Sequence, residues 1–327
     1  MNMKRNLSWL AVLLAVVLTA CSDVVESDPT PKITRIRLPM GYVADVQFAP
    51  WYVAVENGYF AEEGIELEFD YSWETDGVRL AGSGELPFSI ASGDQVILAR
   101  AQGLPVRSIT SWFQRFPVSV VALEESGIEE PADLAGRKVG IPETFGASYI
   151  GWRALTAEHG LEEDDVELEV IGYTQLANLT EGRIDAAVVY ANNEPVQLEQ
   201  MGEDVVQFLV AKEISLVSNG IIANETVLEE QPELVRAFVR AFLKGLRDTL
   251  DDPDKAFEIC RQYVEGLDEN EDVQRAVLDA TIRYWQGDSL GKSDPQAWRN
   301  TVEVMRTAGL LEESVSPDDA FTNAFLP

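Results

Sequence analysis

The feature that most constrains the fold of this chain is the regular alternation of strand-like and helix-like segments. Strand-like segments, with apolar and acidic residues in alternation at 65–71 and a continuous apolar run at 186–190, alternate with amphipathic segments such as 46–57 and 147–159. Residues 231–308 are almost wholly amphipathic helix in pattern. Alternation of this kind predicts an α/β architecture with mainly parallel sheets.

Two further β-rich runs, residues 118–123 and 218–223, flank the middle α/β unit. A chain that leaves one lobe and later returns to it would cross through two such runs. We therefore expect a discontinuous first lobe, residues 33–117 and 219–327, and a second lobe, residues 118–218. Two lobes joined by two crossings suit hinge closure around a ligand.

The amino terminus has the layout of a bacterial export signal. Two basic residues precede an apolar run at 7–17 that is too short to span a bilayer comfortably. The run ends at Leu18-Thr19-Ala20-Cys21, which resembles the lipobox of bacterial lipoproteins. We expect residues 1–20 to be removed as a signal peptide, Cys21 to carry the lipid, and residues 21–32 to form a polar tether. The protein would then be lipid-anchored at the outer face of the cell membrane.

The composition excludes several classes of function. Lys and Arg number 25 against 56 Asp and Glu, a net charge of −31, so binding to a nucleic acid is not expected. The single histidine, His159, and the two cysteines, Cys21 and Cys260, are too few for a His/Cys metal site. With Cys21 lipidated, Cys260 has no disulfide partner. No glycine-rich nucleotide-binding motif is present, so we expect no cofactor and no enzyme activity.

Three segments carry a family resemblance. They are residues 47–65, which read QFAPWYVAVENGYFAEEGI, residues 131–140, PADLAGRKVG, and residues 182–187, GRIDAA. In this order they resemble ABC-transporter substrate-binding proteins of the thiamine-pyrimidine and aliphatic-sulfonate type, over about residues 33–310. The resemblance implies a type II periplasmic-binding-protein fold of two α/β lobes. It also implies a monomer that binds a small molecule between the lobes and delivers it to a permease with its ATPase subunits.

Candidate ligand-binding residues follow predicted strand ends or begin predicted helices, where α/β sheets bind their ligands. They are Tyr42, Asp45, Phe48, Trp73, Ser92, Gln95, Thr144, Tyr149, Tyr190, Asn192 and Glu194. Neighbouring candidates at the same strand ends are Glu74, Asp94, Trp112, Phe113 and Phe145. The set is rich in rings and carboxylates, and its nearest basic residue is Arg115. A sulfonate, nitrate or phosphate would need cations, so a flat, neutral heteroaromatic ligand fits better.

Two motifs indicate which ligand. Residues 41–50, GYVADVQFAP, and residues 190–195, YANNEP, look most like the riboflavin-uptake branch of the family. The pyrimidine-precursor branch tends to have Asn and His where Asp45 and Phe48 stand here, and that His could help bind a phosphate. We therefore expect riboflavin, with a thiamine pyrimidine precursor as the alternative.

Two other classes of function stay open beside uptake. A sensor or adhesion lipoprotein could use the same fold. A related pyrimidine synthase also resembles this chain in outline, but it uses an active-site histidine and a cysteine-rich motif. The present sequence has no such cysteine motif, and its one histidine lies at a predicted helix end.

Overall fold

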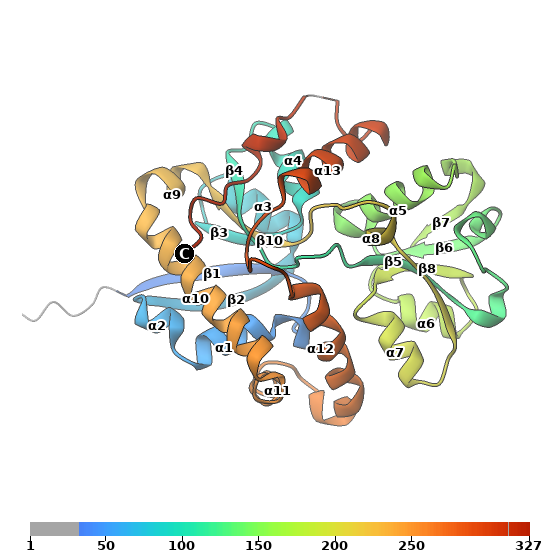
Figure 1. Cartoon of the computed structure of the whole chain (residues 1–327), viewed down its shortest axis with the longest axis horizontal. Coiled ribbons are helices and arrows are strands. Elements are labelled where there is room, and N and C mark those ends of the chain that lie inside the picture. Colours follow the sequence, from blue (N-terminus) through green and yellow to red (C-terminus); the bar gives the residue numbers. More distant parts are fainter. Residues whose placement is uncertain (1–32, 313) are drawn as a thin grey trace, which may run out of the picture. The chain divides into compact units, whose positions relative to one another are not determined.

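Three β-sheets organise residues 33–312 and 314–327, the part of the chain that this computed structural model describes (Figure 1). Their strand orders are β1-β2, β3-β10-β4 and β7-β6-β8-β5-β9. The strands are β1 (Thr34–Gly41), β2 (Ile65–Trp73), β3 (Phe88–Ala91), β4 (Val106–Ser111), β5 (Val118–Leu123), β6 (Lys138–Ile141), β7 (Glu167–Val170), β8 (Ala186–Tyr190), β9 (Val205–Leu209) and β10 (Gly220–Asn224). The predicted signal peptide, Cys21 and the tether lie outside the described residues.

The sequence predicts mainly parallel sheets, and this prediction is wrong. Of the seven strand pairs among the described residues, four are antiparallel, and all four involve β5 or β10. These two strands are the β-rich runs that flank the middle unit. The chain enters β5 from β4 of the three-stranded sheet, and it enters β10 from β9 of the five-stranded sheet. Neither strand follows a helical crossover within its own sheet, so nothing forces it to run parallel to its neighbours.

The strands of the five-stranded sheet all come from residues 118–209, and α5, α6 and α7 lie beside it (Figure 1). The boundaries of two separate lobes stay a prediction.

The helices are α1 (Ala49–Glu56), α2 (Tyr59–Glu62), α3 (Glu74–Gly82), α4 (Gly93–Ala101), α5 (Gly146–Glu158), α6 (Gln175–Thr180), α7 (Glu194–Gln200), α8 (Val210–Glu213), α9 (Glu225–Glu230), α10 (Pro232–Asp251), α11 (Pro253–Cys260), α12 (Glu271–Trp285) and α13 (Pro295–Thr307). None of these helices in the described part is long and apolar enough to cross a bilayer.

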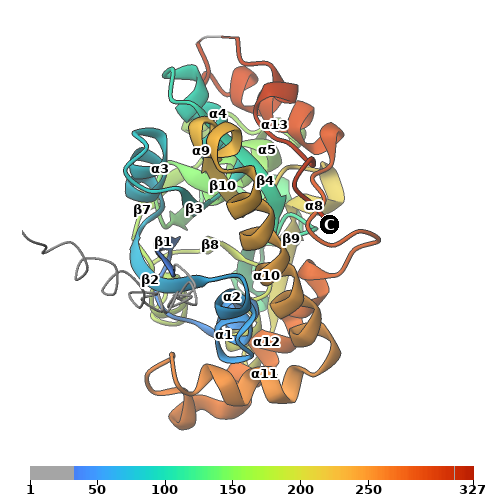
Figure 2. The same cartoon turned by 90° about the vertical axis from the view of Figure 1, so that its left-hand side faces the viewer.

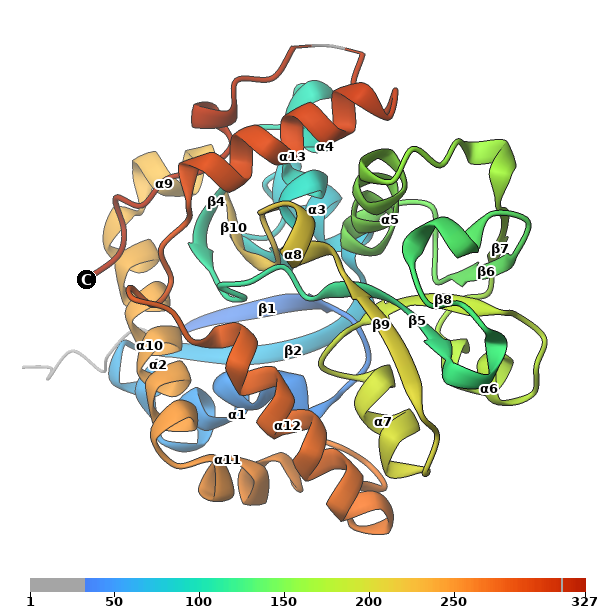
Figure 3. The same ribbon diagram turned by 45° about the vertical axis from the view of Figure 1, so that its right-hand side comes forward.

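One apolar cluster packs α1 and α10 beneath the β1-β2 pair (Figures 2 and 3). Trp51 of α1 is fully buried, and its ring centroid lies 4.2 Å from that of Phe242 of α10. A second cluster joins the five-stranded sheet and α5 to Trp298 of α13 and to α4. These two cores fix the positions of the strand ends and loops that face one another between the sheets.

Candidate functional site

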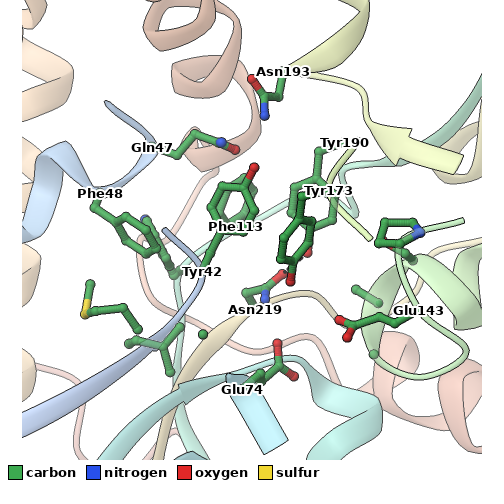
Figure 4. Close-up of a pocket in the computed structure, with 18 of the residues that line it drawn as sticks. Tyr42, Gln47, Phe48, Glu74, Phe113, Glu143, Tyr173, Tyr190, Asn193 and Asn219 are labelled. Atoms are coloured by element: carbon green, nitrogen blue, oxygen red, sulfur yellow. Dashed lines mark hydrogen bonds between the residues drawn. The ribbon is translucent and has the colours of Figure 1, made fainter. Parts of the chain in front are cut away.

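A cavity of about 100 Å³ lies between the carboxyl end of β1 and the loops of the five-stranded sheet (Figure 4). Six aromatic side chains line it, namely Tyr42, Phe48, Trp112, Phe113, Tyr173 and Tyr190. Polar side chains also line it, namely Gln47, Glu74, Glu143, Ser148, Gln175, Asn193, Glu194 and Asn219.

Local capping explains how Gln47 and Phe48 reach the cavity. The carboxylate of Asp45 accepts a hydrogen bond of 2.9 Å from the backbone N–H of Gln47 and starts a 3-10 turn at Val46–Phe48. Pro50 lies in the first turn of α1, where its missing N–H costs nothing. The turn presents Phe48 to the cavity, while Tyr52, one helical turn on, is buried and stacks on Tyr263 at 4.2 Å.

Three rings contact one another at the cavity. Tyr173 lines it and is 40% exposed. The ring of Trp73 stacks on Tyr173 with centroids 5.6 Å apart, and Tyr42 meets Tyr173 edge-on at 4.8 Å. Because Trp73 and Tyr42 belong to the β1-β2 side and Tyr173 follows β7, these contacts join the two walls of the cavity.

A buried amide network fixes one end of the cavity. Asn192 donates from Nδ2 to Gln47 Oε1 at 2.6 Å and to Thr281 Oγ1 at 2.9 Å. Asn193 Oδ1 accepts from Gln197 Nε2 at 2.8 Å, and Glu194 accepts from the backbone N–H of Tyr190 at 3.2 Å. The tyrosine hydroxyl of Tyr190 donates to Asn219 Oδ1 at 2.9 Å.

The other end of the cavity is acidic. Glu74 accepts hydrogen bonds from the N–H and the hydroxyl of Ser92, at 2.9 and 2.6 Å. Burial, with Asp94 and Glu143 nearby, raises the pKa of Glu74 to about 8, and burial with Asp94 raises the pKa of Glu143 to about 7. Of the described residues that line the cavity, none is Lys, Arg or His.

No group of three or more His, Cys, Asp or Glu within the described ranges is arranged to hold a metal ion. Arg115, the nearest basic candidate of the sequence, is exposed and lies outside the lining.

Four of the predicted binding residues line the cavity, namely Tyr42, Phe48, Tyr190 and Glu194. Of the neighbouring candidates at the same strand ends, Glu74, Trp112 and Phe113 also line it, whereas Asp94 and Phe145 do not.

Seven of the predicted binding residues lie outside the lining. Four of them support residues near it: Asp45 caps the turn that carries Gln47, Ser92 holds Glu74, Asn192 holds Gln47, and Trp73 stacks on Tyr173. The remaining three point elsewhere. Gln95 is buried and donates to Asp94, Thr144 is exposed, and Tyr149 accepts a hydrogen bond from Arg153 on α5.

The aromatic and polar lining residues that the sequence did not predict are Gln47, Glu143, Ser148, Tyr173, Gln175, Asn193 and Asn219. Tyr173 follows a strand end and Asn193 begins a helix, so the rule that found their neighbours could have found both. Asn219 lies just before β10, a strand predicted only as a crossing run, and gave no separate signal.

Comparison with known proteins identifies relatives along the whole chain. Residues 45–256 match the family model described as NMT1/THI5 like. The riboflavin-binding protein RibY of Chloroflexus aurantiacus is 39% identical, over 99% of this chain and 99% of that protein. A formylaminopyrimidine-binding protein of Halalkalibacterium halodurans is 29% identical, over 98% of this chain and 99% of that protein.

The family also contains enzymes, and its fold is known. A 4-amino-5-hydroxymethyl-2-methylpyrimidine phosphate synthase of Legionella pneumophila is 26% identical, over 90% of this chain and 93% of that protein. The crystal structure of the periplasmic aliphatic sulphonate binding protein SsuA from Escherichia coli matches with a TM-score of 0.72 at 11% identity. It covers 88% of this chain and 96% of that one, which confirms the periplasmic-binding-protein fold.

Proposed function

Since this chain belongs to the NMT1/THI5-like family, we propose that it is a solute-binding protein that captures riboflavin in the aromatic cavity. It works outside the cell membrane, anchored there by a lipid on Cys21, and hands the vitamin to an ABC permease and its ATPase. The alignment with a riboflavin-binding protein along 99% of both chains supports this ligand.

One observation supports the ligand class most directly: six aromatic rings and several carboxylates line the cavity, and none of the described lining residues carries a positive charge. Rings stack on a planar heterocycle, while amides and carboxylates pair with its polar edge and hydroxyl groups. An anionic ligand would meet Glu74 and Glu143 without a compensating cation.

Capture requires the walls to move apart. A cavity of roughly 150 Å³ holds one benzene ring, so the present 100 Å³ does not hold the three fused rings of riboflavin. The contacts of Tyr173 with Trp73 and Tyr42 are among those that must break and re-form. A ligand that binds both walls then favours the closed form by its higher affinity for that form.

A second candidate is a thiamine pyrimidine precursor. Its single ring needs less space, and the formylaminopyrimidine-binding relative supports it. The synthase reaction has less support from the site. His159, the only histidine of the sequence, is the C-cap residue after α5, and it does not line the cavity.

Titration of the purified full chain with three ligands tests the proposal. Riboflavin fluorescence should be quenched at micromolar vitamin, whereas riboflavin 5′-phosphate should bind at least tenfold more weakly because none of the described lining residues is a cation that could pair with its phosphate. The third ligand is a formylated aminopyrimidine, and its binding is measured by the rise it causes in the melting temperature. Binding of the pyrimidine alone would replace riboflavin with the second candidate, and binding of neither would reject both.

A further inference from the structure

Two buried amide side chains at one end of the cavity have unused hydrogen-bond donors. Gln47 and Asn193 are 6% and 4% exposed, and both line the cavity (Figure 4). Their carbonyl oxygens are taken, Gln47 Oε1 by Asn192 and Asn193 Oδ1 by Gln197. The NH₂ group of Gln47 donates one hydrogen to the carboxylate of Asp45, and that of Asn193 donates one to the hydroxyl oxygen of Tyr42. Each NH₂ group has two hydrogens, so one N–H of each is left for a ligand.

An acceptor lies beside these donors. Glu194 is 9% exposed and also lines the cavity, directly after Asn193 in the chain. One of its oxygens accepts from the backbone N–H of Tyr190, which leaves the other for a ligand. A ligand that covers these groups must offer them partners, because burying a polar group without one is costly, so this end of the cavity is complementary to a ligand edge with matching groups.

The groups available are two amide donors and one carboxylate acceptor. A cyclic imide, with an N–H between two carbonyl groups, offers the matching two acceptors and one donor. The flavin ring of riboflavin carries such an imide edge. An aminopyrimidine instead offers an amino donor beside ring nitrogens, so it leaves at least one of these amide donors without a carbonyl partner.

We propose that Gln47, Asn193 and Glu194 determine specificity by binding the imide edge of the ligand ring. Gln47 Nε2 and Asn193 Nδ2 donate to the two carbonyl oxygens, and the imide N–H donates to Glu194. This inference rests on the proposed function, because it names the part of riboflavin that the cavity recognises.

The test compares riboflavin with its N3-methyl derivative, in which a methyl group replaces the imide hydrogen. Both are titrated into the purified full chain by fluorescence. A flavin altered at position 8, on the opposite edge of the ring, is the ligand control. Wild-type protein should bind the N3-methyl compound at least tenfold more weakly than riboflavin and should tolerate the change at position 8 better.

Three near-isosteric variants locate the effect. Gln47→Glu and Asn193→Asp keep the oxygens that accept from Asn192 and Gln197 but replace each NH₂ group with an oxygen. Glu194→Gln replaces the carboxylate with an amide. Asn178→Asp, on α6, adds the same charge outside the lining of the cavity and is the matched control.

Gln47→Glu and Asn193→Asp should weaken riboflavin binding at least tenfold, with Asn178→Asp unchanged. In Glu194→Gln the dissociation constant of N3-methylriboflavin divided by that of riboflavin should fall toward one. This ratio is measured on one protein sample and therefore does not depend on how much of the variant is folded. Equal binding of riboflavin and its N3-methyl derivative by wild type would overturn this inference while leaving riboflavin as the ligand. Failure of every flavin to bind would overturn both.

Discussion

At the scale of single residues, Glu74 shows how the cavity opposes negative charge. It is the first residue of α3, and its carboxyl group accepts a hydrogen bond from Ser92. Glu143 lies on the same side of the cavity (Figure 4), and Asp94 is also near. Burial is the main cause of its raised pKa of about 8, and the two neighbouring carboxylates add to it. The folded protein therefore keeps a proton on Glu74 at pH values where the unfolded chain has lost it.

Replacing Glu74 with glutamine should make stability less dependent on pH. Between the ordinary pKa of 4.5 and about 8, the folded state binds more protons than the unfolded state, so stability falls as pH rises. One such group changes the free energy of unfolding by at most about 1.4 kcal/mol per pH unit. Glu74→Gln keeps both Ser92 hydrogen bonds and should be more stable than wild type at pH 8, with the gain shrinking toward pH 5.

Urea unfolding at several pH values measures this difference. Glu68→Gln, on the exposed side of β2 and without an ion pair among the described residues, is the control. Its stability should follow the wild-type profile with pH. A constant difference between Glu74→Gln and wild type from pH 5 to pH 8 would show that the carboxyl group of Glu74 titrates alike in both states.

Sequence patterns could predict residues near the site better than the direction of each side chain. Phe48 and Tyr52 share one helical face in the pattern, yet Phe48 lines the cavity and Tyr52 packs against Tyr263. The difference depends on α11 and the segment after it, which lie some two hundred residues away in sequence. Local periodicity carries no information on such distant contacts.

At the scale of elements, the contact between α1 and α10 sets the position of the turn that carries Gln47 and Phe48. Gly245 of α10 faces α1, and a Cβ atom there would lie 2.2 Å from the backbone oxygen of Pro50. The same atom would lie 2.6 Å from the Cβ atom of Ala54. The missing side chain thus allows the two helices to approach closely.

Replacing Gly245 with alanine should destabilise the protein although alanine favours helices by about 1 kcal/mol. The overlap with the backbone of α1 cannot be relieved by a rotamer change, and overpacking of this kind costs about 1–3 kcal/mol or more. Thermal unfolding should show a lower melting temperature, and riboflavin binding should weaken because Phe48 shifts with α1.

The matched control is Gly58→Ala. Gly58 has a φ of +77° but no atom within 4 Å of the added methyl group. It should cost only the backbone strain, about 1–2 kcal/mol, and leave riboflavin affinity unchanged. Wild-type stability and affinity in Gly245→Ala would mean that α1 and α10 separate without cost.

Element types with strong local patterns were predictable, and elements defined by distant pairing were not. The helical pattern of residues 231–308 corresponds to α10, α11, α12 and α13. Strand β9, Val205–Leu209, escaped prediction because its five residues are only partly buried and its partner is the distant strand β5. Its existence depends on the sheet edge that β5 offers.

At the scale of the whole described unit, the cavity exists because distant segments of the chain meet. Its walls combine the end of β1 and the turn after it with the loops that follow β6, β7 and β8. Asn192 connects these walls directly, since it follows β8 and donates to Gln47 before α1 and to Thr281 on α12. If ligand binding closes one wall on the other, this residue stabilises the closed form.

Replacing Asn192 with alanine should therefore weaken binding without a direct contact to the ligand. Loss of buried hydrogen bonds costs about 1–3 kcal/mol, which corresponds to roughly a tenfold to hundredfold rise in the dissociation constant for riboflavin. Because fewer molecules are closed before binding, backbone amides at 42–48 and 190–194 should also exchange hydrogen faster in the unliganded variant. Asn178→Ala removes amide hydrogen bonds confined to residues 174–178 and should change neither measurement. A variant at Asn192 with a lower melting temperature but wild-type affinity and exchange would show that this asparagine contributes to folding stability alone and not to closure.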